Sequence, residues 1–361
     1  MFLRSAHIRH YKSLDDVRVE FTQPITVIVG PNAVGKSNFV DTLRFLAQFC
    51  NLEERYAQVN TDGSTVWQSP IVLRGGLQRV RQRGIGVKDR TQISVNIDVS
   101  TPDSIQETKI TSTLPSTDGE DFSLQTEYIP PRPVWGSNPF DCSDLVKSWQ
   151  FSSIFPNTLR QPSFSYRPNR LMEDGSNWAS VARELKKTKA GKVALNNISE
   201  TMRSIIPGFR DIKVRTVGNY LVPHFLFDDG GKSVEFDPLQ LSDGTLRIFG
   251  LLLAIYQLPA PTLLVIEEPE HTVYPGALGV LVDAMREVSE QTQIILTTHS
   301  PDLVHYFKPD EIRVATIENG HTRIAPICTP QRAAIDEHLM TAEDFMRAEG
   351  LQPEPAQKPA A

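Results

Sequence analysis

The chain has 361 residues, of which 40% are hydrophobic and 22% charged, a composition typical of a globular protein with a sizeable buried core. Its formal net charge of −6 excludes a general attraction to nucleic acid, so DNA could be bound only through a local basic patch. Three scattered cysteines exclude a disulfide framework or a Cys-x-x-Cys zinc site, and the lack of a signal peptide or a bilayer-length apolar run predicts a cytoplasmic protein without membrane association.

The first hundred residues are predicted to form strands around one helix. Residues 7–21 alternate loosely between apolar and polar side chains, and 25–30 (ITVIVG) form the continuous apolar run of a buried strand. Residues 37–49 then place Phe39, Leu43 and Leu46 on one helical face. We expect an α/β lobe here.

Between this strand and this helix lies a phosphate-binding loop, because residues 30–37 (GPNAVGKS) match G-x-x-x-x-G-K-[ST] without a gap. The two glycines let successive backbone N–H groups face a phosphate, Lys36 supplies a charge between the β- and γ-phosphates, and the Ser37 hydroxyl can hold Mg²⁺. The residues expected to bind ATP here are Gly30, Pro31, Asn32, Ala33, Val34, Gly35, Lys36, Ser37 and Asn38.

The middle of the chain differs in character from the first lobe. It holds short strand-like pieces rich in Pro and Ser and one clear helix at 177–187, after which apolar strands and long helices return. This pattern predicts an α/β domain that is split by an α+β insertion. The expected segments are an N-terminal lobe at 1–100, the insertion at 101–235, a C-terminal lobe at 236–330 and an extension at 331–361 with a disordered Pro/Ala/Gln-rich tail.

Two basic runs stand out in this acidic chain. Residues 74–90 gather six Lys and Arg among glycines, which suits phosphate backbones but equally a solvated loop or a surface for an acidic partner. The run has no aromatic side chain to stack on bases, so it does not indicate single-strand readout. Residues 186–192 (KKTKAGK) are interpreted as the solvated face of a helix.

The C-terminal lobe opens with LSDGTLR at 241–247. Locally this is a helix start, with Ser242 as the cap and Asp243 near the positive end of the helix dipole. The same hydroxyl and N–H groups would also suit a phosphate.

Two further strands end in polar residues. TLLVIEEPE at 262–270 places Glu267 and Glu268 at the carboxyl end of a buried strand, where open α/β sheets bind ligands. Glu267 could hold a Mg²⁺-bound water and Glu268 could polarise an attacking water; the alternative is a solvated strand end. QIILTTHS at 293–300 would let His299 reach a γ-phosphate, or pack it against a helix capped by Ser300.

The order of the phosphate loop, LSDGT, EEPE and TTHS resembles the ABC-type ATPases, specifically the soluble branch of SMC, RecF and OLD-like proteins, and within it small prokaryotic AAA-type ATPases of anti-phage defence systems. The 7–21 segment resembles the first strand pair of that branch. The resemblance covers residues 1–100 and 236–310. It implies an ABC-type P-loop ATPase head with a mixed sheet, split by the insertion.

The resemblance also implies roles for single residues. Lys36, Glu268 and His299 are the expected catalytic set. Ser242, Asp243 and Gly244 are the signature residues that contact ATP held by another subunit. The expected Mg²⁺ ligands are Ser37, Glu267 and a glutamine, for which Gln68 is chosen while Gln48 and Gln78 stay open. Tyr11-Lys12-Ser13 flanks the adenine or ribose, or is an exposed turn.

These features predict an ATPase that uses ATP and Mg²⁺ and forms a head-to-tail, ATP-dependent homodimer or higher oligomer. No coiled-coil arm is visible and the short remainder after His299 predicts no appended nuclease, so we expect the ATPase to regulate a separate effector, a nuclease or toxin. The alternatives are a RecF-like DNA-binding repair ATPase, with DNA bound by 74–90 and the insertion, and a nucleotide-gated assembly scaffold.

Overall fold

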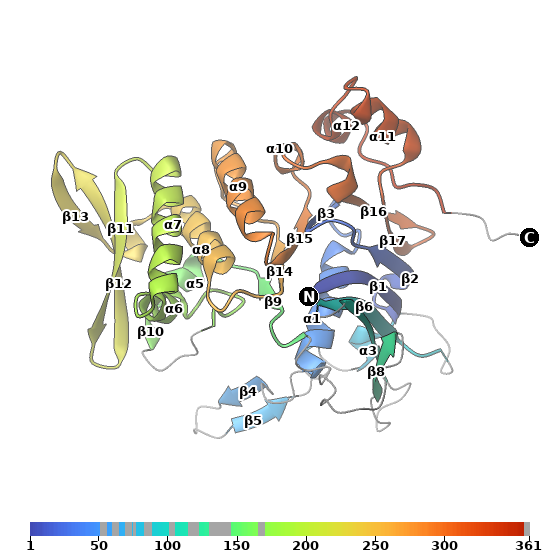
Figure 1. Cartoon of the computed structure of the whole chain (residues 1–361), viewed down its shortest axis with the longest axis horizontal. Helices are drawn as coiled ribbons and strands as arrows, with labels where there is room; N and C mark the ends of the chain where they lie inside the picture. Colours follow the sequence, from blue (N-terminus) through green and yellow to red (C-terminus); the bar gives the residue numbers. More distant parts are fainter. Residues whose placement is uncertain are drawn as a thin grey trace, which may run out of the picture. The chain divides into compact units, whose positions relative to one another are not determined.

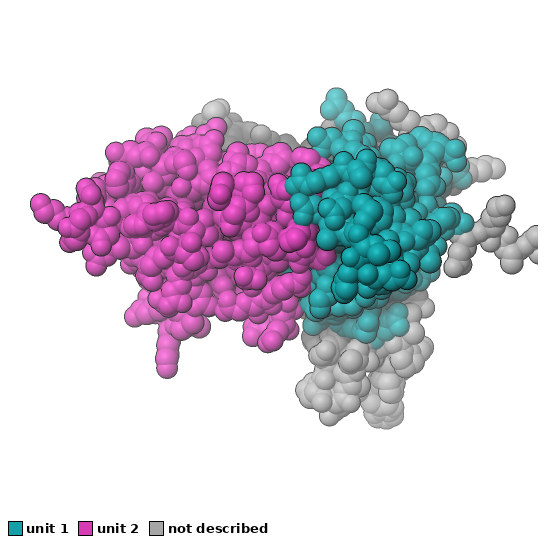
Figure 2. Space-filling model, turned by 90° about the horizontal axis from the view of Figure 1, so that it is seen from above, with its two compact units in different colours: residues 1–149, 308–361 teal, residues 150–307 magenta. Residues whose placement is uncertain are grey.

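The computed structural model describes residues 1–50, 56–59, 65–68, 74, 77–82, 89–100, 105–114, 123–129, 146–164 and 170–356. The chain divides into two compact units, which Figure 2 colours separately: unit 1 comprises residues 1–149 and 308–361, and unit 2 comprises residues 150–307. The lobe boundaries expected from the sequence stay a prediction.

An antiparallel sheet forms the N-terminal part of unit 1. Its strand order is β2-β1-β6-β7-β8, and Figure 1 labels β1, β2, β6 and β8. Val17 and Val19 of β2 are buried while Asp16, Arg18 and Glu20 are exposed, which is the alternation expected of a strand with one covered face. The strands are β1 (Phe2–Tyr11), β2 (Leu14–Glu20), β6 (Gln92–Ser100), β7 (Ile105–Thr113) and β8 (Ser123–Ile129).

A mixed group of strands carries the phosphate loop of unit 1. The fully buried strand β3 (Ile25–Val29) runs parallel to β16 (Ile312–Glu318), and β16 pairs antiparallel with β17 (His321–Ala325). Helix α1 (Lys36–Cys50) follows β3 and buries the predicted apolar face of Phe39, Leu43 and Leu46. The other described elements of unit 1 are β4 (Tyr56–Val59), β5 (Thr65–Gln68), α3 (Leu77–Val80), η4 (Pro309–Glu311), α11 (Thr329–Asp336) and α12 (Ala342–Ala348).

Unit 2 contains three parallel strands in the order β15-β14-β9. These are β9 (Gln150–Ser152), β14 (Leu263–Glu267) and β15 (Gln293–Thr298), and they are joined to helices α8 (Asp243–Tyr256) and α9 (Leu278–Val288). A second, antiparallel sheet has the order β10-β12-β11, with β13 paired to β12. The other elements are β10 (Ser163–Phe164), β11 (Phe209–Val217), β12 (Tyr220–Asp229), β13 (Lys232–Phe236), α5 (Pro156–Leu159), α6 (Trp178–Leu185), α7 (Lys189–Ile205), α10 (Pro301–Val304), η2 (Pro238–Gln240) and η3 (Pro275–Ala277).

Aromatic packing joins the two parts of unit 2. Trp178 of α6, Phe225 of β12 and Phe249 of α8 are fully buried, with ring centroids 5.0–5.6 Å apart. The Trp178 indole N–H donates to the Leu159 carbonyl at 2.9 Å, so burying it leaves no unsatisfied donor. Helix α8, which begins at the LSDGT segment, is thus fixed by residues from the middle of the chain. Within the described residues, no helix is both long and apolar enough to cross a membrane.

Phe249→Ala should lower the free energy of unfolding of unit 2 by about 3–5 kcal/mol, because it removes the ring that both Trp178 and Phe225 pack against and leaves a cavity. Chemical denaturation followed by circular dichroism measures the loss. Phe155→Ala is the matched control, since the Phe155 side chain is 58% exposed and should change stability little. Equal losses for the two variants would contradict this packing.

Candidate nucleotide site

The phosphate loop lies between β3 and α1, in the strand–loop–helix context that the sequence predicts. Its glycines sit where a side chain cannot fit. A Cβ on Gly30 would lie 2.3 Å from the Ala315 carbonyl oxygen of β16, and a Cβ on Gly35 would lie 2.1 Å from the Thr322 hydroxyl. Gly35 also has φ of 97°, in the left-handed region. The neighbouring strands therefore require glycine at both positions.

Polar side chains around the loop form hydrogen bonds with other groups of the same chain. The buried Lys36 ammonium donates to the Gly30 and Pro31 carbonyls at 2.7 and 2.9 Å. The Asn38 amide donates to the Ser13 hydroxyl at 2.8 Å, and Ser13 in turn lies 2.6 Å from the Thr322 hydroxyl. Ser37, one position after Lys36, is exposed at the start of α1. The Lys36 ammonium therefore lies next to the loop in which a phosphate is predicted to bind.

Beside the loop helix, the Asp41 carboxylate collects three donors. It accepts hydrogen bonds from the Tyr11 hydroxyl at 2.7 Å, from the Lys12 ammonium at 2.6 Å and from Arg74, whose nearest contact is 2.7 Å. Burial alone would raise the pKa of Asp41, but the hydrogen bonds and charge of Arg74, with help from Lys12 and Tyr11, hold it well below its usual range. Burial raises the pKa of Tyr11, and the Asp41 charge raises it further.

The structure shows where several of the residues predicted to surround the nucleotide lie. The Tyr11 ring is fully buried, so of the Tyr11–Ser13 stretch only Lys12 and Ser13 keep accessible surface. Arg74 of the basic run is paired with Asp41 and also donates to Gln48 at 2.8 Å. Gln78 is exposed on α3. Gln68 ends β5, and its side chain lies outside the described residues.

In unit 2, the carboxyl ends of β14 and β15 bring two predicted residues together. The strands are parallel, with Glu267 opposite Thr297, and the Glu268 N–H donates to the Thr297 carbonyl at 2.9 Å. The Glu268 carboxylate lies 3.3 Å from Nδ1 of His299. Glu268 has φ of 46°, a left-handed backbone that few non-glycine residues adopt and that turns the chain away from the strand.

Two further residues join this cluster that sequence reasoning did not assign. Nε2 of His271 lies 2.6 Å from the other carboxylate oxygen of Glu268. Glu270 accepts a hydrogen bond from the Thr298 hydroxyl at 2.6 Å and one from the His299 N–H at 3.4 Å. In the sequence, the one indication of a role for Glu270 and His271 is that they directly follow the EEP segment. In the structure they lie in the turn that packs against the end of β15.

A buried arginine fixes the same turn from helix α8. Arg247 is 5% exposed, and its Nη2 donates to the carbonyls of Glu267 and Glu268 at 3.3 and 3.1 Å. Burial lowers the pKa of Arg247, while the charges of Glu270 and Glu268 oppose that shift. The signal for this residue is a charged side chain inside the otherwise apolar run 246–256.

The helix-start reading of LSDGT is confirmed. The Ser242 hydroxyl caps α8 by accepting from the Thr245 N–H at 3.2 Å, and Asp243 pairs with Arg160 at 2.7 Å. Gly244 packs against the turn after β14, since a Cβ there would lie 2.7 Å from the Thr272 carbonyl oxygen. Ser242 and Asp243 are exposed, and the nucleotide contact expected of them stays a prediction.

Comparison with known proteins places this arrangement in a family. The family described as "AAA domain, putative AbiEii toxin, Type IV TA system" matches residues 25–305, which begin at β3 and end after His299. The chain belongs to this AAA-domain family. The match includes the phosphate loop, the LSDGT segment and the EEPE and TTHS strand ends.

Curated relatives match over shorter stretches. The DNA replication and repair protein RecF of Nostoc sp. is 34% identical over 99 residues, which cover 23% of this chain and 26% of RecF. RecF of Trichormus variabilis is 45% identical over 99 residues with the same coverage. The Retron Ec83 probable ATPase of Escherichia coli is 25% identical over 182 residues, covering 46% of this chain and 32% of the relative. The matches thus span about a quarter to a third of the relatives' lengths.

Solved structures of SMC heads share the fold. An SMC head bound to the C-terminal winged-helix domain of ScpA superposes with a TM-score of 0.60 at 12% identity, covering 93% of this chain and all of the other. The SMC head with an extended coiled coil from Pyrococcus furiosus gives 0.55 at 12% identity, with coverage of 94% and 99%. The predicted α/β fold, an ABC-type ATPase head with a mixed sheet, is confirmed.

Asp41→Ala should cost about 3–5 kcal/mol of unfolding free energy at neutral pH, because it leaves the buried Arg74 without its carboxylate. The folded pKa of Asp41 lies below the ordinary value of 3.8, so the contribution is present above that pH and is lost as the pH falls toward the folded pKa. Denaturation curves at several pH values should therefore converge for wild type and variant in acid.

Asp16→Ala is the control for this prediction. Asp16 also pairs with basic side chains, but it is more than half exposed, so its loss should have little effect at any pH. A difference between Asp41→Ala and wild type that stays constant into strong acid would contradict the assigned pKa shift.

Proposed function

We propose that the chain binds and hydrolyses ATP in the cytoplasm and forms a head-to-tail dimer around two nucleotides. The observation that carries this proposal is the contact of Glu268 with His299 at the ends of two parallel strands, in a chain that also has a complete phosphate loop. In the proposal, residues 30–38 hold the triphosphate and the Lys36 ammonium exchanges its two backbone carbonyls for phosphate oxygens.

The proposed nucleotide is accompanied by Mg²⁺, with Ser37, Glu267 and Gln68 as its proposed ligands. The exposed Ser37 hydroxyl and the Glu267 carboxylate at the end of β14 are the hard oxygen donors that Mg²⁺ prefers, and Gln68 remains the proposed third contact. When bound, the ion would neutralise charge on the phosphate oxygens.

Glu268 is the proposed general base of the hydrolysis. Its carboxylate would accept the proton of the attacking water, and His299 would contact the γ-phosphate. Arg247 positions Glu268 by holding the backbone carbonyls on which the turn depends. The left-handed backbone at Glu268 aims the side chain away from the strand, toward the side on which His299 follows β15.

The exposed start of helix α8 supports the proposed dimerisation. Ser242 caps a 14-residue helix, and its first N–H groups and dipole favour an anion at this end. We assign this end to the γ-phosphate of the ATP bound by a second copy. The output is proposed to be a separate effector, a nuclease or toxin, in a defence system; the family description and the retron ATPase relative support this direction.

Glu268→Gln should slow ATP hydrolysis by about 10²–10⁴-fold while keeping ATP binding, because it removes only the base. The variant should therefore accumulate as a dimer in ATP and Mg²⁺, measured by size exclusion with light scattering. Adding Ser242→Arg should abolish that dimer but not ATP binding, whereas Lys36→Ala should abolish binding itself.

Glu290→Gln is the matched control, since Glu290 is an exposed glutamate of the same unit that has no part in the proposed site. It should hydrolyse ATP as wild type does. The proposal would be contradicted if Glu268→Gln hydrolysed ATP at the normal rate. It would also be contradicted if Glu268→Gln with Ser242→Arg dimerised as well as Glu268→Gln alone. A protein that co-purifies with the trapped dimer would be the candidate effector.

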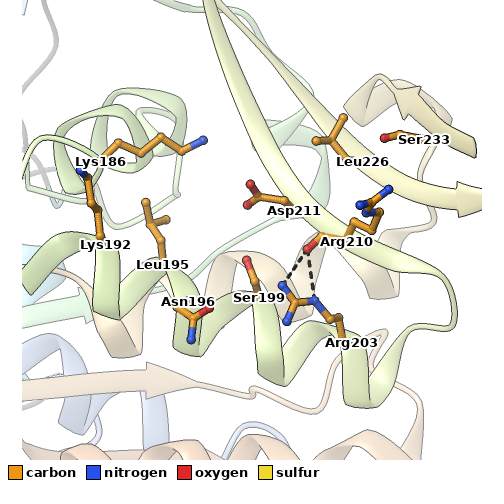
Figure 3. A pocket seen from close by; sticks show the side chains of 10 residues that line it. All are labelled: Lys186, Lys192, Leu195, Asn196, Ser199, Arg203, Arg210, Asp211, Leu226 and Ser233. Atoms are coloured by element: carbon orange, nitrogen blue, oxygen red, sulfur yellow. Dashed lines mark hydrogen bonds between the residues drawn. The ribbon is translucent and has the colours of Figure 1, made fainter. Parts of the chain in front are cut away.

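A second candidate function, DNA binding in the manner of RecF, is favoured by a basic cavity in unit 2. The cavity has a volume of about 710 Å³ and lies between α7 and β11 (Figure 3). The cavity is lined by four basic side chains and one carboxylate, that of Asp211. The basic residues are Lys186, Lys192, Arg203 and Arg210. Within it the Arg203 guanidinium donates to the Arg210 carbonyl at 3.0 and 3.2 Å.

In the cavity, Lys186 donates to the Ile212 carbonyl at 2.6 Å, and some cations of the described basic run also have partners within the protein, while Arg79 and Arg90 of that run are exposed. In that run Arg74 is paired with Asp41, and Arg81 donates to the Asp89 carbonyl at 2.8 Å. Residues 83–88 lie outside the described residues. The insertion is the candidate DNA surface that the next experiment tests, because its cations gather around one cavity.

If DNA binds here, Lys192→Glu with Arg210→Glu should weaken binding of a labelled duplex at least about tenfold and lower the salt slope by about two, since two phosphate contacts are lost. Fluorescence anisotropy at several salt concentrations measures both. Arg9→Glu with Arg18→Glu makes the same charge change on exposed positions of unit 1 and should not alter the slope. Binding indifferent to salt, or unaltered by the first pair, would remove this candidate.

A further inference from the structure

Three metal-ligating side chains meet at the turn after β14. Glu268, His271 and His299 each offer one ligand atom, and these atoms all lie within 4.8 Å of one another. The Glu268 carboxylate lies between the two rings, 2.6 Å from Nε2 of His271 and 3.3 Å from Nδ1 of His299. The rings stand perpendicular, with centroids 5.5 Å apart.

The backbone holds this arrangement from both strands. The His271 N–H donates to the Glu268 carbonyl at 3.2 Å, which places the two side chains on the same side of a tight turn. Arg247 fixes the start of the turn, and Glu270 fixes His299 by accepting its N–H. The ligands are therefore positioned by contacts that do not depend on their own side chains.

Two imidazoles and one carboxylate form the donor set of an open zinc site, which uses three protein ligands and leaves a fourth position for water. Mg²⁺ and Ca²⁺ instead prefer all-oxygen sites. Bond lengths of about 2.0–2.2 Å put tetrahedral ligand atoms roughly 3.3–3.5 Å apart. The Glu268 oxygens lie 2.6 Å from Nε2 of His271 and 3.3 Å from Nδ1 of His299, and all the candidate ligand atoms lie within 4.8 Å of one another, so small side-chain rotations would bring three of them onto one ion.

The local charge also favours a cation. Glu268 and Glu270 face one buried guanidinium, that of Arg247, and a Glu270 oxygen lies 3.8 Å from Nδ1 of His299. The side chains of Glu268, His271 and His299 are 28%, 54% and 38% exposed, which leaves an ion a path from solution.

We propose that Glu268, His271 and His299 bind a transition-metal ion of the zinc class, and that this ion inhibits ATP hydrolysis. Inhibition rests on the proposed function, because the ion takes up the carboxylate assigned as the base together with the histidine assigned to the γ-phosphate. Metal binding itself rests only on the geometry of the three side chains. His271 is the residue that distinguishes the two, since it has no part in the proposed hydrolysis.

The first test is a Co²⁺ titration of the full chain without nucleotide, after treatment with a chelator. Wild type should develop the visible absorption of tetrahedral Co²⁺ at one equivalent and lose it when Zn²⁺ is added. His271→Ala should bind at least about tenfold more weakly, the smaller end of the loss caused by removing even an outer partner of a metal ligand. His305→Ala, which changes an exposed histidine of the same unit, should bind as wild type does.

The second test is ATP hydrolysis in Mg²⁺ with rising Zn²⁺. Zn²⁺ should inhibit wild type and His305→Ala at concentrations that leave His271→Ala at its own starting rate. Absence of the Co²⁺ signal, or an equal signal in folded His271→Ala, would overturn the metal site. Equal inhibition of all three proteins would overturn its inhibitory role. Co²⁺ binding by a chain that hydrolyses no ATP would instead support the metal site and refute the proposed ATPase.

Discussion

The candidate site in unit 2 depends on the hydrogen bonds from Arg247 to the carbonyls of Glu267 and Glu268. Burying a guanidinium in an apolar helix is costly unless its donors and charge are compensated. Here the backbone of the turn accepts from Nη2, and the carboxylates of Glu268 and Glu270 offset part of the charge, while the buried Nε has no hydrogen-bond partner. The turn thereby keeps a left-handed residue, Glu268, at the position where a base would be needed. The same contact links that position to the helix that Ser242 begins.

Close backbone approach plays the corresponding part in unit 1. Gly30 and Gly35 lie so near β16 and Thr322 that no Cβ fits, and the Ser13 hydroxyl joins Thr322 to Asn38. The predicted phosphate loop therefore contacts residues that lie near both ends of the sequence. Asp41 adds a second brace, since it ties the helix after the loop to Lys12 and Arg74. These hydrogen bonds hold the loop and the helix that follows it within unit 1.

The features that could be predicted from the sequence are those that depend on residues close together in the chain. The GPNAVGKS motif predicted the loop between β3 and α1, and the two apolar strands predicted that Glu268 and His299 each follow a strand end, but their contact with each other is known only from the structure. Arg247 and His271 could not be assigned, because their contacts depend on how α8 packs on β14 and on a turn with unusual backbone angles. Arg74 appeared to be a surface charge because nothing in its neighbourhood reveals Asp41, thirty-three positions earlier. The packing of Trp178 on Phe249 could not be predicted either, because the two residues lie in segments of different composition, the insertion and the C-terminal lobe.

The central claim is that ATP is hydrolysed between a phosphate loop from one copy and a Ser242 helix start from another. Mixing two inactive variants tests it most directly. Lys36→Ala retains an intact Ser242 and Ser242→Arg retains an intact phosphate loop, so a mixed dimer contains one complete site. The account predicts that hydrolysis appears on mixing, at about a quarter of the wild-type rate if the copies pair at random. Activity of Ser242→Arg alone, or a mixture that stays inactive although wild type dimerises and hydrolyses ATP, would contradict it.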